Sequence, residues 1–506
     1  MTAIVGYSGF VGSNLLQSIK FDYFYNSKNF KDANNMKFDN MYFCGIPAVK
    51  WYANKYPDED ENVFENIKQV LDTITVNNFF HISTIDVYDN VNNMLTEDDS
   101  IDYNNNHTYG RNRFLFEEYV KNRFSNVYII RLPALFGKGL KKNILFDLLT
   151  NNMIEKIIPT TYFQWYDLNW LKNDIDMMIK NNIKLINLFT EPVLTSDIID
   201  LFDYPKNIFN YNLIGNNYNT KTKYSSSGYI RDKIQVLNSI KEFIKFYKIN
   251  KDNLVVSNIC LNNISHFQFA CILKLNGISH VQIAPTTLAL WEKLNDINFN
   301  DYSMNNIKVY SLQSLTYGID NMNIFENTDF FIKHMTNVIN IAKKNNIRVL
   351  VFGCPKNRYI KTSNDKNHFV NIFRILGDLC APDVFICIEP NAKEYGCNFI
   401  NNINDAGDIV TKINHCYIKM MIDSGNIIME NDNISDIYKY KDYIYNVDFS
   451  MPYMNKFIQM GYHSEIKNIL NSFNYKYKIN LEMRKNNENE LQILNESLIN
   501  FINIFS

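Results

Sequence analysis

The sequence feature that most constrains the fold is a series of eight short apolar segments in the C-terminal half of the chain. Each has the length and the branched-chain or aromatic content of a buried strand, and helical stretches such as 330–344 and 369–379 separate most of them. Eight strand–helix units within about 250 residues are typical of a closed, parallel (β/α)8 barrel. The expected strands are 254–260, 280–284, 307–312, 347–353, 384–389, 418–423, 443–450 and 477–483.

Each of the last four expected strands ends in an acidic residue. In (β/α)8 barrels the reactive groups lie at the carboxyl ends of the strands, so these four carboxylates are expected to converge. Like charges held together need a cation, and an all-oxygen ligand set suits Mn²⁺ or Mg²⁺ better than Zn²⁺. The alternative is a network of structural salt bridges. The predicted metal ligands are Glu389, Asp423, Asp448 and Glu482.

Polar residues at other strand ends of the same half are candidates for substrate contacts. Gln282 and Gln313 lie at or just after the second and third expected strands, and Lys356 and Arg358 follow the fourth. A cation in such a loop can anchor a phosphate or a sugar oxygen through charge-assisted hydrogen bonds. The alternative interpretation of Lys356 and Arg358 is a solvated basic loop.

The N-terminal half follows a different pattern, in which strands and helices alternate up to residue 248. This alternation predicts a parallel sheet with helices on both faces. The first strand, 2–6, runs into a glycine-rich turn that opens a helix, and such a turn lets the backbone approach a pyrophosphate at the helix N-terminus. A tight strand–helix turn without a ligand is the alternative. The residues predicted to bind the cofactor here are Gly6, Gly9, Phe10, Val11 and Gly12.

The end of the second expected strand, 22–25, bears on the choice of cofactor. NAD-binding domains usually place an acidic residue there, where it binds the ribose hydroxyls. Here the strand is followed by Asn26, Ser27 and Lys28, none of them acidic. Ser27 and Lys28 can instead meet a 2′-phosphate, which favours NADP over NAD. An exposed loop lysine is the alternative for Lys28.

Two further segments, 81–88 (HISTIDVY) and 108–113 (TYGRNR), carry a resemblance to a known family. With the glycine-rich turn, they resemble the extended short-chain dehydrogenase/reductase family, the NAD-dependent epimerase/dehydratase group that acts on nucleotide sugars. The resemblance covers residues 1–250 and implies a Rossmann-type domain that binds NAD or NADP. By motif, Thr84 takes the place of the catalytic Ser or Thr, and Tyr109 takes that of the catalytic Tyr.

The residue types fit hydride transfer at a carbinol carbon. The Tyr109 phenol can move the proton on the oxygen if a nearby cation lowers its pKa, and the Thr84 hydroxyl can orient the same oxygen. The sequence departs from the family at Arg113, where the family has Lys. Arginine keeps the positive charge, but it does not lose its proton and cannot hold a ribose as a compact ammonium does. Gln164, within segment 163–167, is expected to face the substrate of this reaction.

The C-terminal half, residues 254–506, resembles the xylose-isomerase-like TIM barrels of the sugar phosphate isomerase/epimerase superfamily. The matching segments are 277–286, 352–358, 388–391, 422–425, 446–450 and 480–484. The resemblance implies one divalent metal held by Glu, Asp, His and Glu, with Asp448 in the His position and Gln282 in place of the usual Glu. It also implies that Glu389 and Glu482 move a proton between adjacent carbons of a carbonyl sugar. A DNA-repair endonuclease that binds several zinc ions uses the same barrel, but it does not fit a chain with eight histidines.

Composition excludes several other classes of protein. The net charge of −2 provides no strongly basic face, so nucleic acid is not an expected partner. No apolar run reaches about 18 residues, which predicts no membrane span. The eight cysteines form no CxxC pair, and no basic signal region begins the chain, which together predict a reducing, cytoplasmic location. The dehydrogenase resemblance is compatible with a homodimer.

The sequence thus predicts an α/β protein of two domains, a Rossmann-type doubly wound parallel sheet in residues 1–250 and a (β/α)8 TIM barrel in residues 251–506. The predicted function is a carbohydrate-modifying enzyme. It joins an NAD(P)-dependent reductase, epimerase or dehydratase to a metal-dependent sugar isomerase or epimerase, in the synthesis of an unusual sugar or glycan. The expected substrate is a small sugar or nucleotide sugar. Two alternatives stay open: a cofactor- or sugar-binding scaffold or sensor that has lost catalysis, and a protein in which only the barrel is active.

Overall fold

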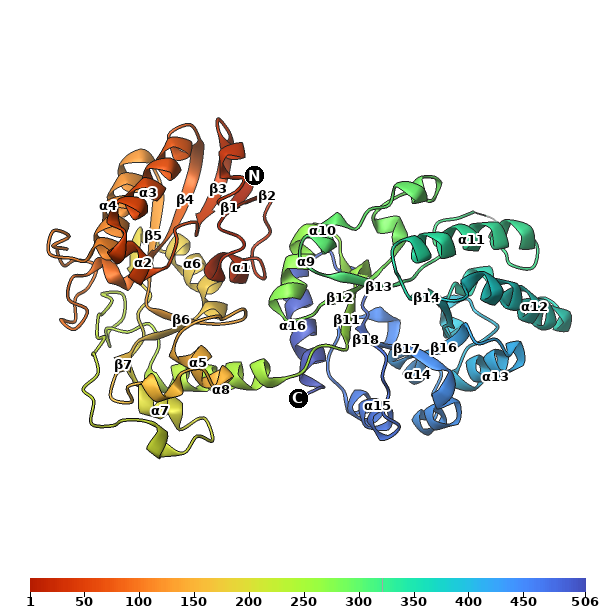
Figure 1. Ribbon diagram of the computed structural model, residues 1–506. Coiled ribbons are helices and arrows are strands. Elements are labelled where there is room, and N and C mark those ends of the chain that lie inside the picture. The colour runs from red at the N-terminus through yellow and green to blue at the C-terminus, as the bar shows by residue number, and fades with distance from the viewer. Residues whose placement is uncertain (321) are drawn as a thin grey trace. The chain divides into compact units, whose positions relative to one another are not determined.

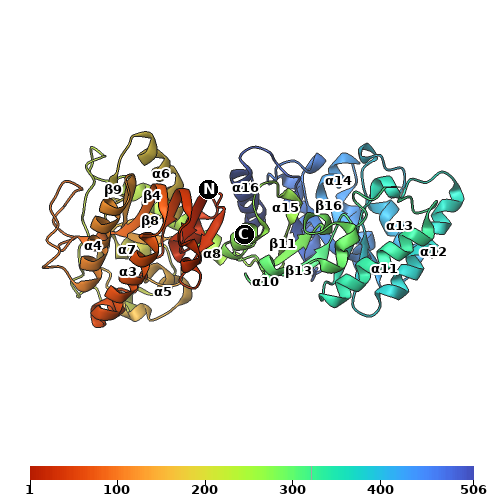
Figure 2. The ribbon, with the colours of Figure 1, turned by 90° about the horizontal axis from the view of Figure 1, so that it is seen from above.

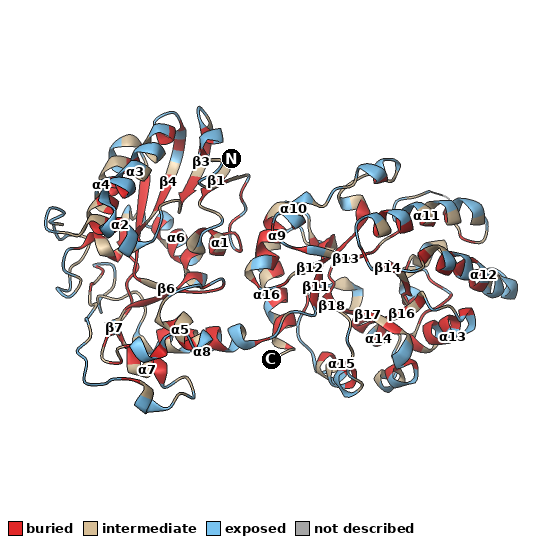
Figure 3. Ribbon diagram, viewed as in Figure 1, coloured by how far each residue is buried: buried red, intermediate tan, exposed pale blue. Residues whose placement is uncertain are grey.

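The computed structural model describes residues 1–320 and 322–506 (Figure 1). The chain divides into two compact units, Met1–Lys248 and Ile249–Ser506. The strands of both units are largely buried, whereas the outer helices carry both buried and exposed residues (Figure 3). In the described part of the chain, no helix is long and apolar enough to cross a membrane.

The N-terminal unit, all of which is described, is built on a six-stranded parallel sheet. Its strands are β1 (Thr2–Val5), β2 (Tyr23–Tyr25), β3 (Lys37–Phe43), β4 (Thr75–Thr84), β5 (Val127–Leu132) and β9 (Leu185–Asn187). They lie in the order β2-β1-β3-β4-β5-β9. The strand order therefore changes direction between β1 and β3. In open α/β sheets, ligands bind outside the carboxyl ends of the strands at such a switch point.

Four helices of this fully described unit cover the two faces of the sheet: α1 (Phe10–Leu15), α3 (Pro57–Leu71), α4 (Thr108–Arg123) and α6 (Leu171–Lys180). On one face, Phe64 of α3 and Phe116 of α4 pack in the same hydrophobic core as Phe43 and Phe79 of the sheet. Helices α1 and α6 lie on the other face (Figure 1). The predicted parallel sheet is confirmed.

The strand order differs from that of the Rossmann-type domain expected for residues 1–250. A Rossmann sheet has the order 3-2-1-4-5-6 in sequence numbering. Here the second strand, β2, is at the edge, and the third, β3, lies on the other side of β1. The segment between β2 and β3 forms a short 3-10 helix, Phe30–Ala33, instead of a strand outside β2. The Rossmann assignment is therefore not confirmed, although the switch point beside β1 is present.

The remaining helices and strands of the N-terminal unit are short, apart from the last helix. They are α2 (Lys50–Lys55), β6 (Ala134–Phe136), α5 (Ile144–Thr150), β7 (Tyr162–Phe163), β8 (Trp165–Asp167), β10 (Val193–Leu194), α7 (Thr195–Ile199) and α8 (Lys233–Lys248). Strand β6 pairs with β8, and β7 pairs with β10. Trp165, Ile198 and Phe243 join β8, α7 and α8 in a second hydrophobic core.

Parallel strands close into a barrel in the C-terminal unit. In the described residues they number eight: β11 (Leu254–Ser257), β12 (His280–Ile283), β13 (Lys308–Leu312), β14 (Val349–Phe352), β15 (Phe385–Ile388), β16 (Ile418–Asp423), β17 (Ile444–Phe449) and β18 (Ile479–Leu481). Each pairs with the next, and β18 pairs with β11. The predicted (β/α)8 barrel is confirmed, with each strand at its expected place in the sequence.

Helices cover the outside of the barrel. They are α9 (His266–Leu275), α10 (Asn300–Ser303), α11 (Thr328–Lys344), α12 (Ser363–Cys380), α13 (Ile403–Ile413), α14 (Ser424–Met429), α15 (Gly461–Ser472) and α16 (Glu490–Asn503). Helices α11, α12 and α13 lie side by side around the barrel in both views (Figure 1, Figure 2).

Alternate residues of neighbouring strands pack together inside the barrel. Val349, Cys387 and Met421 belong to one such buried cluster. Side chains two residues apart on a strand point to the same side. Glu389 follows Cys387 by two residues, and Asp423 follows Met421 by two. The strand geometry therefore directs both carboxylates to the same end of the barrel interior.

Candidate functional site

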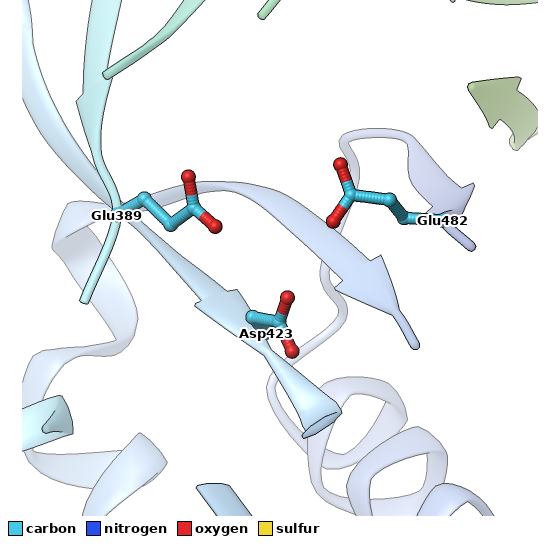
Figure 4. A group of neighbouring side chains, drawn as sticks. All are labelled: Glu389, Asp423 and Glu482. Atoms are coloured by element: carbon cyan, nitrogen blue, oxygen red, sulfur yellow. The ribbon is translucent and has the colours of Figure 1, made fainter. Parts of the chain in front are cut away.

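Three carboxylates meet at the carboxyl ends of the barrel strands. Glu389 directly follows β15, Asp423 ends β16, and Glu482 directly follows β18. One oxygen atom of each lies within 4.8 Å of the others, and in the described part of the chain this is the group whose geometry could hold a metal ion. Figure 4 shows the three side chains reaching toward a common point from different strands.

The loop after β14 is shaped to accept the Glu389 carboxylate. A Cβ atom on Gly353 would lie 2.2 Å from Oε2 of Glu389 and 3.1 Å from Oδ1 of Asn391. Any larger residue at position 353 would therefore displace the carboxylate. The glycine next to the strand end is a requirement of the site itself.

Arg358 braces the same loop from within the protein. Its side chain is fully buried. Its Nη1 donates to the carbonyl oxygens of Gly353 and Glu389, its Nη2 to Asn391 Oδ1 and the Ile400 carbonyl, and its Nε to the Phe399 carbonyl. All five N–H groups of the guanidinium are thus used by protein acceptors.

This geometry is at odds with the predicted role of Arg358 as a substrate anchor, because every donor of its guanidinium has a protein acceptor; the role itself stays a prediction. The sequence could not show this network, since the acceptors belong to two loops, those after β14 and β15. Lys356, the other predicted anchor, is exposed in the short 3-10 helix Pro355–Asn357. Its contact with a substrate stays a prediction.

Asp423 is held by the chain that follows it. The backbone N–H of Asn426 (2.9 Å) and the hydroxyl of Ser450 (2.6 Å) both donate to Oδ1 of Asp423. Asp423 is the N-cap of α14, so the first of these bonds also begins that helix. Because both bonds converge on Oδ1, the carboxylate is fixed with Oδ2 left for the centre of the acidic group.

Gln313, which follows the third strand of the barrel, interacts with residues at the ends of the first and last strands. Gln313, buried just after β13, donates a hydrogen bond to the Ser257 hydroxyl at the end of β11. The Gln313 side chain also interacts with Glu482 and opposes the rise of the pKa of that carboxyl. Gln313 therefore lies beside the acidic group, as a substrate contact would require, although its contact with a substrate stays a prediction.

Asp448 stands outside the group of three, in the described structure, although it is buried like Asp423 and Glu482. Asn446 donates to its Oδ1 at 2.6 Å, and Gln282 donates to its Oδ2 at 3.2 Å. Gln282 in turn accepts a hydrogen bond from the Ser311 hydroxyl at 2.8 Å. Asp448 and Gln282, predicted as a metal ligand and a substrate contact, are thus bound to each other inside the barrel.

Burial and mutual repulsion dominate the electrostatics of these acids. Burial raises the pKa of Glu389, Asp423, Asp448 and Glu482. At Glu389 the charges of Asp423 and Asp448 raise the pKa further, and Arg358 lowers it only in part. A cation placed among the carboxylates would reverse this balance. Carboxylate oxygens alone are the ligands that Mg²⁺ and Mn²⁺ prefer, so the donor set fits such an ion.

Tyr395 is a neighbour of this group that the sequence pattern does not mark. It lies in the loop after β15, in the 3-10 helix Lys393–Tyr395. Burial raises the pKa of its phenol, and the charges of Asp423, Glu482 and Glu389 raise it further. The ring therefore lies close enough to all three carboxylates to border a bound substrate.

The glycine-rich turn of the N-terminal unit is tightly packed. Gly6 has a φ of +87°, and its Cβ would lie 2.5 Å from the Cys44 carbonyl oxygen; a Cβ on Gly12 would lie 2.2 Å from the Gly6 carbonyl oxygen. Gly9 is the N-cap of α1, and Phe10 and Val11 are its first residues. The turn accordingly requires glycine at positions 6 and 12 whether or not a ligand is bound.

The loop after β2 contacts this turn. Nδ2 of Asn26 donates to the Tyr7 hydroxyl at 3.1 Å, while Ser27 and Lys28 are exposed. Asn26, Ser27 and Lys28 are thus next to the glycine-rich turn, and their binding of a ribose or 2′-phosphate stays a prediction.

Tyr109 lies in the first turn of α4, which packs against the chain that follows β4. The Tyr109 N–H donates to Oδ1 of Asn54 at 2.9 Å, and His107 caps the helix by accepting from the Gly110 N–H. A Cβ on Gly110 would lie 2.0 Å from the Asp86 carbonyl oxygen, so glycine allows the helix to approach the chain that follows β4. Burial raises the pKa of Tyr109 to about 12, against a smaller lowering by Arg113. The phenol is therefore protonated at neutral pH.

Arg113 is committed to a buried ion pair. Its Nη1 lies 2.6 Å from Oδ2 of Asp60 and its Nη2 lies 3.0 Å from Oδ1, while Nη2 also donates to the Pro47 carbonyl at 2.7 Å. The guanidinium carbon stacks 3.8 Å from the centre of the Tyr109 ring. Only 3% of the side chain is exposed. The prediction that Arg113 contacts a cofactor is at odds with this geometry, because its head group faces protein on all of these sides.

Thr84 lies in a polar chain that the sequence analysis missed. Its hydroxyl donates to Oδ2 of Asp86 at 3.2 Å, and Oδ1 of Asp86 forms an ion pair with Lys50 at 2.7 Å. Asp86 falls within the segment that carries the family resemblance, but Lys50 comes from α2, and no spacing pattern relates the two. Long-range pairing of this kind cannot be inferred from one sequence.

The side chain of Gln164 links two backbone segments inside the N-terminal unit. Its Nε2 donates to the carbonyl oxygens of Thr190 and Thr220, both at 2.7 Å, and its Oε1 accepts from the Thr220 N–H at 2.9 Å. The side chain is buried, with its hydrogen-bonding groups used by the backbone. The predicted substrate contact of Gln164 is at odds with this geometry and stays a prediction.

The C-terminal unit thus presents three carboxylates at the carboxyl ends of a closed parallel barrel, in a geometry that could hold a metal ion. A family model described as "Xylose isomerase-like TIM barrel" matches residues 300–500. This match supports the resemblance of the C-terminal half to the xylose isomerase-like TIM barrels. The dehydrogenase resemblance of residues 1–250 has no support from the comparisons. No curated protein matches the chain.

Solved structures similar to the chain include three proteins of different activity. 3-Keto-D-glucoside 4-epimerase YcjR from E. coli aligns over 50% of this chain and 99% of its own, with 14% identity and a TM-score of 0.42. D-Psicose 3-epimerase from Clostridium cellulolyticum H10 aligns over 50% and 99%, with 13% identity and a TM-score of 0.43. A family 2 AP endonuclease from Brucella melitensis aligns over 47% and 95%, with 13% identity and a TM-score of 0.40.

The role of Arg113 can be tested by removing its charge. We expect Arg113→Met to lower the free energy of unfolding by about 3–5 kcal/mol, because it leaves Asp60 buried and without its partner. Lys121→Met, on the same helix, breaks an exposed pair with Glu118 and should cost less than about 1 kcal/mol. Calorimetry of the full chain measures both. Equal, small losses in the two variants would contradict a structural role for Arg113.

The acidic group predicts an opposite pH response with and without metal. Burial raises the pKa of Glu389 to about 8, so the stability that its proton confers is complete below the unfolded pKa and is lost as the pH rises through 8. The melting temperature of the metal-free protein should therefore fall between about pH 4.5 and pH 8, and less so in Glu389→Gln. Added Mn²⁺ should raise it most at high pH, where the ligands are deprotonated.

Thermal unfolding in EDTA and in MnCl₂ across this pH range measures both effects. Lys55→Met, at an exposed position of the other unit, controls for the general response of the protein to pH. A melting temperature that does not respond to Mn²⁺ at any pH would contradict a metal site.

Proposed function

We propose that the barrel is a divalent-metal-dependent isomerase or epimerase that moves a proton on a sugar or sugar derivative. The observation that carries this proposal is the buried group of Glu389, Asp423 and Glu482, with one oxygen of each within 4.8 Å of the others. Such a set favours Mn²⁺ or Mg²⁺ over Zn²⁺. The family match of the barrel supports the same class of reaction.

In this proposal Glu389 and Glu482 hold and move the proton. One carboxylate takes a proton from the carbon next to the substrate carbonyl, and the other carboxyl group gives one back. Return to the opposite face of the same carbon inverts it, which is epimerisation, whereas return to the former carbonyl carbon moves the carbonyl, which is isomerisation. Burial favours the protonated form of these carboxyls, so one acid and one base can coexist in the pair.

The other residues of the group orient the reacting parts. A divalent cation bound by Glu389, Asp423 and Glu482 would polarise the substrate carbonyl and so make the neighbouring carbon more acidic. Asp423 is kept rigid by Ser450 and by the start of α14. Tyr395 excludes water from one side of the group, and Gln313 offers an amide to a sugar hydroxyl.

Substitution of the two bases tests this mechanism. Glu389→Gln and Glu482→Gln keep the side-chain shape but remove the base, so each should slow proton exchange about 10²–10⁴-fold. The measurement is deuterium incorporation from D₂O into ketopentoses and ketohexoses in the presence of Mn²⁺, followed by NMR. Glu394→Gln, exposed in the loop after β15, is the matched control and should keep the wild-type rate.

Asp448→Asn distinguishes three metal ligands from four. If the ion is held by the group of three, this variant should change Mn²⁺ affinity far less than Glu389→Gln does. An equal loss would restore Asp448 as a ligand. A wild-type chain that neither binds Mn²⁺ nor exchanges protons on any ketose would favour the alternative of a sugar-binding scaffold that has lost catalysis.

We propose a second activity for the N-terminal unit, the binding of NADP or NAD and redox chemistry on a sugar or nucleotide sugar. The observation that favours it is the position of the glycine-rich turn at the switch point between β1 and β3. A bound nicotinamide would supply or accept the hydride. Tyr109, protonated at neutral pH, gives its proton to the carbonyl oxygen. With a proton shift in the barrel, the two units would act on consecutive steps in making an unusual sugar.

Tyr109→Phe tests the redox proposal, because it removes the acid and keeps the ring that stacks on Arg113. We expect NADPH and NADH to bind the variant as tightly as the wild type, while the oxidation of NADPH in the presence of sugar carbonyls is lost. Fluorescence titration and absorbance at the NADPH band measure the two properties. If the wild-type chain binds neither nucleotide, the proposal falls and only the barrel remains as an enzyme.

A further inference from the structure

Lys50, Asp86 and Thr84 form a connected polar chain at the carboxyl ends of β3 and β4. The Lys50 ammonium lies 2.7 Å from Oδ1 of Asp86, and the Thr84 hydroxyl donates to Oδ2 of the same carboxylate. Thr84 also caps this turn, because its Oγ1 accepts a hydrogen bond from the Asp86 N–H. The three groups are thus held together from three elements of the chain, the helix α2, the end of β4 and the turn after it.

The partners of this chain differ from those of Arg113. Arg113 is 3% exposed, and its guanidinium donates hydrogen bonds to Asp60 and to the carbonyl oxygens of Pro47 and Tyr109. Lys50 pairs with Asp86, and 42% of its side chain is exposed. An ammonium has three donors. With one donor on Asp86, two remain available to a ligand.

Titratable groups from other parts of the unit interact electrostatically with the Lys50–Asp86 pair. Burial lowers the pKa of His107 and raises that of Tyr218, and in both cases Lys50 and Asp86 act on the group in opposite directions. Asp86 also acts on the Tyr109 phenol. His107 precedes α4, and Tyr218 comes from a loop near the end of the unit, so groups from distant parts of the sequence surround the pair.

The position of this chain relative to the glycine-rich turn follows from the sheet. Strand β3 lies between β1 and β4, and all three are parallel. Their carboxyl ends therefore share one edge. A dinucleotide whose pyrophosphate sits at the turn after β1 extends along that edge past β3, which brings its second ribose toward Lys50 and Thr84.

We infer that Lys50 is the cation that binds the nicotinamide ribose of the dinucleotide, with Asp86 holding the ammonium in place. This inference rests on the function proposed for the N-terminal unit. Arginine at position 113 is then no obstacle to cofactor binding, because the compact ammonium comes from α2 instead of α4. Arg113 keeps a structural role as the partner of Asp60 and the support of the Tyr109 ring.

The test compares complete dinucleotides with shorter nucleotides that lack the part Lys50 would contact. NADPH and NADH carry the nicotinamide ribose, whereas 2′,5′-ADP and ADP lack it. We expect Lys50→Met in the full chain to weaken NADPH or NADH binding about 10- to 100-fold, because it removes charge-assisted hydrogen bonds. The affinity for 2′,5′-ADP or ADP should stay within about twofold of wild type. Isothermal titration calorimetry measures all four ligands.

Two further variants separate this role from a structural one. Lys55→Met, at the end of the same helix, is exposed and should bind all four nucleotides as the wild type does. Lys50→Arg keeps the pair with Asp86 and should restore only part of the loss, because its planar head group fits a ribose less well. Melting temperatures of the variants check that each is folded.

The possible results are distinct. A wild-type chain that binds no dinucleotide overturns the proposed function of the N-terminal unit and this inference with it. Wild-type binding with no change in Lys50→Met overturns the inference alone. Equal losses for NADPH and 2′,5′-ADP in Lys50→Met also overturn it, since they would assign Lys50 to the general structure of the site. Selective loss of the complete dinucleotide supports it.

Discussion

The crowding of buried carboxylates at one end of the barrel is the constraint on which the rest of the C-terminal unit depends. Glu389, Asp423 and Glu482 are brought together by strands that cannot separate without opening the barrel. Burial and mutual repulsion raise the pKa of each. The neighbouring residues do not neutralise this charge. Gly353 makes room for one carboxylate, and Ser450 fixes another. The arrangement is costly for folding and useful for holding a cation, which is typical of functional sites.

In the N-terminal unit, buried carboxylates are instead paired with buried arginines. Glu117 and Arg131 are both almost fully buried and form an ion pair at 2.6 Å, with further hydrogen bonds from Ser83 and to Tyr88. Arg113 and Asp60 form a second pair of the same kind. Such pairs are complete within the protein, so they specify packing and offer nothing to a ligand. Lys50 differs from these cations because 42% of its side chain is exposed, and its partner Asp86 also accepts a hydrogen bond from the Thr84 hydroxyl.

The barrel could be predicted from the sequence because its signals are local. Each strand is an apolar run, and the acids at 389, 423 and 482 follow these runs directly, so their convergence is a consequence of parallel strands in one barrel. The roles of Arg358 and Gln164 could not be predicted, because their partners are backbone carbonyls of remote loops. The absence of a strand outside β2 could not be predicted either, because the glycine-rich turn specifies only the local connection from β1 to α1.

Two departures from family patterns acquire different meanings once the side chains have positions. Asp448 stands where a histidine is usual, and in this structure it is bonded to Gln282 and Asn446. These hydrogen bonds with two neutral amides hold the Asp448 carboxylate outside the group of the other three acids. The remaining candidate ligands form a smaller set in which every ligand atom is oxygen. Arg113 stands where a lysine is usual, and its fork matches Asp60 at two points. Because its guanidinium is bound to Asp60 at two points, Arg113 is not available to a cofactor. An ammonium that binds a cofactor must therefore come from another element at this edge of the sheet.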